Sequence, residues 1–219
     1  DVFVARVTTN GRFQNMNNNF GTYLGGNRDD VAKKIMVLPS GEVVVAGLSK
    51  GNMPTAFTNH RGDWDVFMAK FSSNGRNLTS GAYIGGTSTE DLLGLYFSQS
   101  TNSIWISGTT SSSNFPANPS YRPEQSKLAG GIDGFLARVD PSAFGVNYAT
   151  YLGGSDYDEC TGVVCTDRGD PYVCGSSRSN SASIPTFYDS YSRVNKGGLR
   201  EGFIRKIAFG QLSLTYPNS

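Results

Sequence analysis

Four near copies of one seven-residue stretch divide this 219-residue chain into units of similar length. The copies begin 64 or 68 residues apart and read DVFVARV at 1–7, DVFMAKF at 65–71, DGFLARV at 133–139 and EGFIRKI at 201–207. Tandem units of this length are typical of architectures in which one supersecondary unit stacks on the next and buries a continuous core. The repetition therefore restricts the chain to a repeat fold.

Further elements follow the seven-residue stretch in a constant order. A Tyr-x-Gly-Gly step comes first, at Tyr23, Tyr83 and Tyr151, and LTYP at 214–217 stands where a fourth would begin. An acidic residue comes four positions after the second glycine, at Asp30, Glu90 and Asp158. Two apolar runs around a turn come next, at 35–47, 95–108 and 163–175. Short apolar runs between turn residues indicate strands, so each unit is predicted to hold four strands, called A, B, C and D here.

A single four-stranded sheet cannot bury both of its faces until neighbours pack against it. We therefore predict an all-β fold, a β-propeller-like array of four-stranded blades with about three and a half repeats. The predicted blades are residues 1–64, 65–132 and 133–200, and residues 201–219 hold strands A and B of a partial fourth repeat. Strand A is largely apolar on both faces, so Phe67 and Phe135 are predicted to be buried between blades.

The unit D-x-F-x-A-[RK], TYLGG, an acidic residue, G-x-[VI]-x-[VI]-x-G-x-[ST]-S and FP, in this order, resembles the SBBP-type β-propeller repeat. The resemblance covers nearly the whole chain. It implies a propeller in an extracellular or cell-surface protein, and it supplies no catalytic residue. The chain departs from the pattern at 52–54, where NMP replaces DFP, and at 216–219, where YPNS replaces the fourth Gly-Gly.

The charge balance argues against two classes of partner. The formal net charge is +1 and the lysines and arginines are not clustered, so we expect no binding to nucleic acid. No apolar run approaches the roughly 20 residues that a membrane-spanning helix needs, so no membrane insertion is expected. The first residues lack the features of a signal peptide, which indicates that a secretion signal was removed or lies upstream.

The recurring charged residues have more than one interpretation each. The carboxylates after Gly-Gly either accept backbone N–H groups in a turn or bind calcium, although calcium sites use more tightly clustered oxygen ligands. A basic residue recurs in strand A, at Arg6, Lys70, Arg138 and Lys206. These side chains form a ring of positive charge that faces a ligand, pair with the carboxylates after Gly-Gly, or simply extend from the end of the strand so that their charged groups reach water. No metal or cofactor is predicted.

Other candidate sites carry weaker signals. His60, the single histidine, could be a general base, but no serine or cysteine partner is recognisable for it. Two Arg-Gly-Asp triplets, at 61–63 and 168–170, are either integrin ligands on exposed loops or ordinary turn chemistry. No catalytic residue is predicted, and the chain is expected not to be an enzyme.

All three cysteines lie in the third unit and lack the C-x-x-C spacing of zinc sites. If Gly169 and Asp170 form a two-residue turn, Cys165 and Cys174 lie opposite each other across the C–D hairpin and could form a disulfide. If the register follows the first unit, the two are diagonal and too far apart without adjustment. Cys160 is then the alternative partner or a buried free thiol.

The loops offer two candidate surface sites. NLTS is a sequon that makes Asn77 a candidate for N-glycosylation on the A–B loop of the second repeat. The long D-to-A connectors carry aromatic residues that could either bind sugars or fill the joints between blades, namely Trp64, Tyr121, Tyr188 and Tyr191.

These features predict an extracellular structural or interaction module whose partners are other protein chains or copies of itself. The alternative is a carbohydrate-binding module that uses the connectors to hold glycans, and a propeller enzyme is a third class that lacks repeat-breaking acid or base residues. The partial fourth repeat would leave an open strand edge. The chain is therefore predicted either to belong to a larger propeller or to assemble by strand addition into a filament.

Overall fold

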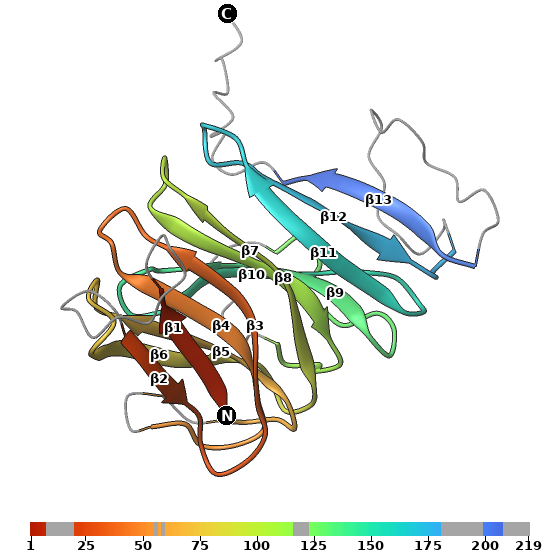
Figure 1. Ribbon diagram of the computed structural model, residues 1–219. Coiled ribbons are helices and arrows are strands. Elements are labelled where there is room, and N and C mark those ends of the chain that lie inside the picture. Colours follow the sequence, from red (N-terminus) through yellow and green to blue (C-terminus); the bar gives the residue numbers. More distant parts are fainter. Residues whose placement is uncertain (8–19, 55–56, 58–59, 116–122, 181–198, 208–219) are drawn as a thin grey trace, which may run out of the picture.

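The computed structural model of the protein describes residues 1–7, 20–54, 57, 60–115, 123–180 and 199–207. These residues form strands and turns without a helix, which confirms the all-β class. Since they contain no helix, they contain none long and apolar enough to cross a membrane. The strands are β1 (Val2–Arg6), β2 (Phe20–Leu24), β3 (Asp30–Val37), β4 (Val43–Ser49), β5 (Asp65–Phe71), β6 (Leu78–Ile84), β7 (Glu90–Ser98), β8 (Ser103–Thr110), β9 (Asp133–Val139), β10 (Val146–Leu152), β11 (Asp158–Cys165), β12 (Pro171–Ser177) and β13 (Glu201–Lys206), as Figure 1 shows.

The strands form four antiparallel sheets, with the orders β1–β2, β3–β4–β5–β6, β7–β8–β9–β10 and β11–β12–β13. Each four-stranded sheet takes strands C and D from one repeat and strands A and B from the next. The predicted blades, with A to D in one sheet, are therefore wrong by half a repeat. The physical reason is the Gly-Gly turn, which carries the chain from one sheet to the next, while the long D-to-A connector joins neighbouring strands of the same sheet.

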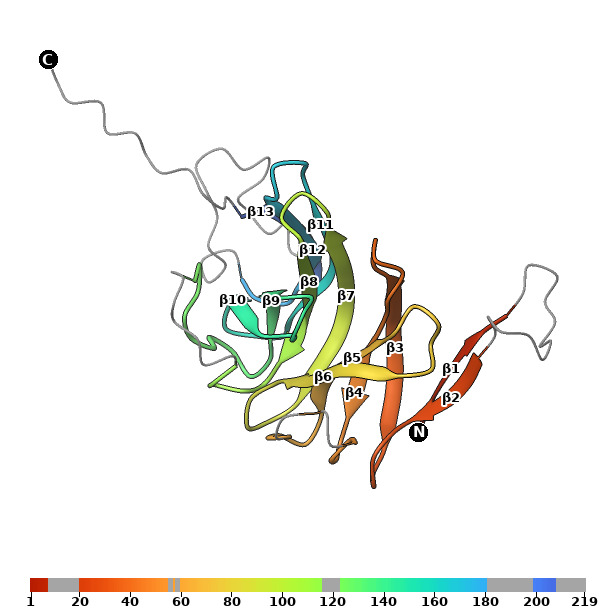
Figure 2. The ribbon, with the colours of Figure 1, turned by 90° about the vertical axis from the view of Figure 1, so that its left-hand side faces the viewer.

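The sheets stack on one another in chain order, as the two views in Figures 1 and 2 show. An apolar cluster fills each of the spaces between successive sheets. Strand β5 serves two of these clusters, because Val66 and Met68 point into one and Phe67 and Ala69 into the other. Phe67 and Phe135 are both 0% exposed, which confirms their predicted burial. The described strands form an open array and do not close into a ring.

A glycine of strand D lies opposite a phenylalanine of strand A in three of the sheets. The pairs are Gly47 with Phe67, Gly108 with Phe135, and Gly175 with Phe203. Strand C carries a register irregularity beside each glycine. A Cβ added to these glycines would lie 2.0, 1.8 and 1.8 Å from a carbonyl oxygen of strand C. The [DE]-x-F and G-x-[ST] motifs therefore reflect one contact, in which the aromatic ring covers a strand position that has no room for a side chain.

Large apolar side chains are exposed at both ends of the array. Phe3 is 57% exposed and Tyr23 is 75% exposed on the two-stranded first sheet, whereas the equivalent Tyr151 is 3% exposed. Val164 and Ile204 are exposed on the last sheet. The outer faces of the two end sheets thus carry the apolar residues that inner sheets bury, because no further sheet packs on them among the described residues.

Candidate functional site

The acidic residue after each Gly-Gly step closes the turn. Its carboxylate accepts the N–H of the second glycine at 2.8 Å in Asp30, 3.0 Å in Glu90 and 2.6 Å in Asp158. The turn interpretation of these carboxylates is confirmed. Within the described ranges, no group of three or more His, Cys, Asp or Glu side chains is placed to hold a metal ion.

A second carboxylate, from the first residue of strand A, lies beside the first. Asp65 accepts the N–H of Arg61 at 2.7 Å, and Asp133 accepts that of Ala129 at 2.8 Å, so each holds the end of its own connector. The Cβ position of Gly85 lies 2.2 Å from Asp65 Oδ1 and 2.5 Å from Glu90 Oε2. Only a glycine leaves room for both carboxylates. Sequence reasoning missed this pairing, although the aspartate of D-x-F recurs with the same period as the acidic residue after Gly-Gly.

The paired carboxylates are buried, and their negatively charged groups lie close together. Asp65 is 0% exposed, and its Oδ1 has no hydrogen-bond partner among the described residues. Burial, and to a lesser extent the charge of Asp65, raises the pKa of Glu90 above its ordinary value. Burial and the nearby Asp158 likewise raise the pKa of Asp133. Glu90 and Asp133 therefore retain a proton to higher pH than the same side chains in water.

This environment predicts a pH dependence that the Glu90→Gln variant should remove. Because the folded-state pKa is raised, the favourable contribution of protonated Glu90 is complete below the unfolded-state pKa and is lost as the pH rises through the folded-state pKa. We expect the wild-type protein to gain stability relative to Glu90→Gln when the pH falls from about 8 to about 5. Urea titrations at several pH values measure the difference, with Asp63→Asn as the exposed control. A difference that stays constant over this range would contradict the buried pair.

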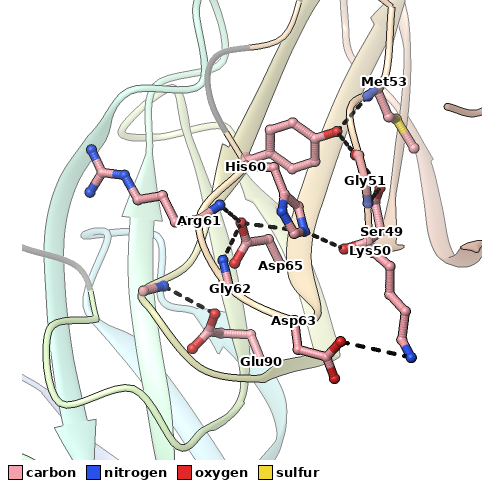
Figure 3. Close-up of polar contacts among 12 residues, drawn as sticks. Ser49, Lys50, Gly51, Met53, His60, Arg61, Gly62, Asp63, Asp65 and Glu90 are labelled. Carbon is pink, nitrogen blue, oxygen red and sulfur yellow. Dashed lines mark hydrogen bonds and ion pairs between the residues drawn. The ribbon is translucent and has the colours of Figure 1, made fainter. Parts of the chain in front are cut away.

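His60 connects the first long connector to the sheet (Figure 3). Its Nε2 lies 3.0 Å from the carbonyl oxygen of Ser49 and 3.8 Å from Asp65 Oδ2. The ring also meets that of Tyr83 edge-on, with 5.3 Å between centroids. These contacts hold the connector in place, and among the described residues the ring has no hydrogen bond with a serine hydroxyl or a cysteine thiol. The general-base interpretation of His60 therefore gains no support.

The basic residues of strand A do not pair with the carboxylates after Gly-Gly, so that one of the three interpretations is wrong. Lys70 is buried and donates to the carbonyl oxygens of Pro141 and Ser142 at 3.1 and 3.2 Å. Arg138 donates to Ser103, Lys206 pairs with Asp170, and Arg6 is exposed. The basic residues stand near the end of strand A, whereas the carboxylates lie beside its start. Because these basic side chains have different partners, they do not form one ring that faces a ligand.

The structure does not bring Cys165 and Cys174 together. Cys165 lies opposite Pro171 and Cys174 opposite Gly162, so the two thiols occupy opposite faces of the β11–β12 hairpin. The hairpin closes through residues 166–170, with the N–H of Thr166 bonded to the carbonyl of Asp170, and the two-residue turn does not form. All three cysteines are free thiols, and Cys160 is buried, which raises the pKa of its thiol.

These positions predict the order in which the thiols react. A thiol reagent should modify the exposed Cys174 in the native protein, while Cys160 should stay protected until the protein unfolds. Burial raises the pKa of Cys165 to about 11, so this thiol should react more slowly than Cys174. Under denaturing, non-reducing conditions we expect three reactive thiols per chain. A count of one would restore the disulfide and require a different register in β11–β12.

The remaining candidates do not converge on one site. Asn77 is exposed in the β5–β6 turn, as a glycosylation acceptor would be. Trp64 is half-buried, packs on the core cluster and carries Lys50 over its ring at 4.8 Å, which places it at a joint between sheets. Tyr121, Tyr188 and Tyr191 lie outside the described residues.

The two Arg-Gly-Asp triplets belong to turns. In the first, the N–H groups of Arg61 and Gly62 bond to Asp65, although Arg61 and Asp63 have exposed side chains. In the second, Gly169 has a positive φ of 86° in the β11–β12 turn and Asp170 pairs with Lys206. The turn interpretation explains the second triplet fully and the backbone of the first.

No protein-family model matches the chain, and a search of curated proteins finds no significant match. The resemblance to the SBBP-type repeat therefore depends on the quoted motifs alone.

Proposed function

We propose that the chain is a non-catalytic structural and interaction module of an extracellular or cell-surface protein, built from blades of the SBBP β-propeller type. One observation carries the proposal: the recurring polar residues of the repeat serve the architecture. The carboxylates of Asp65 and Glu90, which would be the natural candidates for acid–base chemistry, are bonded to the backbone of turns and connectors. A repeat whose charged groups hold its own loops is suited to scaffolding.

The exposed apolar faces of the array also support a role in contacts between proteins. Propellers typically use about four to eight blades, and the described strands give two complete four-stranded sheets with incomplete sheets on both sides. Large exposed apolar patches commonly mark contacts with other protein surface. The proposed partners are accordingly other protein chains or copies of this one, joined into a filament or surface layer.

A glycan array separates this function from carbohydrate binding. We expect no saturable binding of the purified chain to any glycan, because Trp64, which is the one of the four candidate aromatic residues that the structure describes, is packed into a joint. Saturable binding that Trp64→Ala abolishes would overturn the scaffold function in favour of a carbohydrate-binding module.

A further inference from the structure

The two inner junctions between sheets bring carboxyl groups together in the same way. The N–H of Glu90 donates to the carbonyl oxygen of Trp64 at 2.8 Å, and that of Asp158 donates to the carbonyl oxygen of Ile132 at 3.0 Å. Each hydrogen bond joins the first residue of a strand C to the residue before strand A of the preceding sheet. The pairs of carboxyl groups that meet across successive sheets are Asp65 with Glu90 and Asp133 with Asp158.

Each pair leaves one carboxylate oxygen without a hydrogen-bond partner among the described residues. This oxygen is Asp65 Oδ1 in the first pair and Asp158 Oδ1 in the second. The other oxygen of each aspartate already accepts hydrogen bonds from its surroundings. All four side chains of the two pairs are at most 1% exposed. Because a buried polar atom without a partner is costly, each of these two oxygens calls for a donor.

The group beside the unpartnered oxygen is the other carboxyl of the pair. A Cβ added to Gly85 would lie 2.2 Å from Asp65 Oδ1 and 2.5 Å from Glu90 Oε2, so these two oxygens are close to one point. The carboxyl groups of the second pair meet in the same way around Gly153. Two carboxyl groups this close in a buried site do not both ionise readily. A carboxyl that keeps its proton can donate it to the unpartnered oxygen.

The directions of the pKa shifts agree with this geometry. Burial raises the pKa of Glu90 and of Asp133, the two members that face an unpartnered oxygen. The other titratable groups that face the pairs are His60 on the connector, Tyr83 on β6, Tyr151 on β10 and Cys160 on β11. Burial raises the pKa of both tyrosines and of the cysteine, so these three groups stay neutral below about pH 9.

We propose that each of these two junctions holds one shared proton, which the carboxyl of Glu90 donates to Asp65 Oδ1 and that of Asp133 donates to Asp158 Oδ1. Each hydrogen bond then fastens one sheet to the next. When the pH rises and the proton leaves, two buried carboxylates repel each other and the junction weakens. The stabilisation is therefore complete below the unfolded-state pKa and is lost as the pH rises through the raised folded-state pKa. This pH-sensitive device goes beyond the proposed function and holds whichever partner the array contacts.

Hydrogen exchange at the N–H groups of Glu90 and Asp158, read by NMR, tests each junction separately. In the wild-type chain both groups should lose protection at least about tenfold between about pH 6 and about pH 9, after correction for the intrinsic exchange rate. The Glu90→Gln variant should lose this dependence at position 90, because its amide donates permanently to Asp65 Oδ1, and should keep it at Asp158. The Asp133→Asn variant should show the reverse, and it serves as the test if Glu90→Gln does not fold. A dependence that is absent from the wild-type chain, or unchanged at the substituted junction, would overturn the shared proton.

Two further measurements separate the proton from other causes. The His60→Gln variant should keep the dependence at Glu90, and its loss there would assign the effect to the imidazole. Millimolar calcium at about pH 9 should leave protection unchanged, because calcium takes about six to eight oxygen ligands and each pair offers one unpartnered oxygen. Protection that calcium restores, and that Glu90→Gln abolishes, would overturn the proton in favour of a bound cation.

Discussion

Replacement of Phe135 by alanine should lower the free energy of unfolding by roughly 3–5 kcal/mol, the cost of removing a fully buried aromatic ring. The ring is 0% exposed, lies 4.4 Å from that of Phe115 between centroids, and covers Gly108 on the neighbouring strand. The vacated space is bounded by two sheets that are each held by their own hydrogen bonds, so it should not collapse. Urea denaturation followed by tryptophan fluorescence measures the loss.

The matched control is Phe3→Ala at the equivalent position of the first repeat. Because Phe3 is 57% exposed and has no glycine of a strand D beneath it among the described residues, the loss should be less than about 1 kcal/mol. Equal losses in the two variants would show that the first sheet is packed like the inner ones, contrary to the structure.

Substitution of Gly108 by alanine should cost about 3 kcal/mol, at the upper end of overpacking effects. The added Cβ would lie 1.8 Å from the carbonyl oxygen of Asp91 and 2.8 Å from the ring of Phe135. The carbonyl belongs to the backbone of strand C, so relief requires the strands to separate and the ladder hydrogen bonds between β7 and β8 to weaken.

Gly145→Ala tests whether this cost comes from the contact or from the loss of a glycine in general. An added Cβ at Gly145 would meet no atom within 4 Å, so the substitution should change stability by less than about 0.5 kcal/mol. A Gly108→Ala variant as stable as Gly145→Ala would mean that strand C does not approach strand D as described.

The sequence supports the strand content and the core because both follow from local pattern. Strand A alternates apolar side chains on both faces, and this alone predicts that Phe67 is buried, as it is. The carboxylates of Asp30 and Asp158 follow Gly-Gly at a constant spacing, and an aspartate beside a glycine turn commonly accepts backbone N–H groups. Interactions within a few residues of each other are therefore readable from the repeat.

Contacts between distant residues are not readable in this way. A period of 64–68 residues is the same whether a sheet holds A to D or C, D, A and B, so the repeat does not reveal which turn crosses between sheets. The pairing of Asp65 with Glu90 spans that crossing and became apparent only in three dimensions. In the third hairpin, the turn through residues 166–170 sets the register that separates Cys165 from Cys174.

The half-repeat offset gives the array a simple rule for growth by gene duplication. The inherited segment runs from A to D, but the folded sheet runs from C through D and A to B, so every new copy is shared between two sheets. A copy one period long, inserted in phase anywhere in the array, adds one complete sheet and restores every junction on both sides. Gain or loss of one period therefore needs no compensating change in the neighbouring repeats.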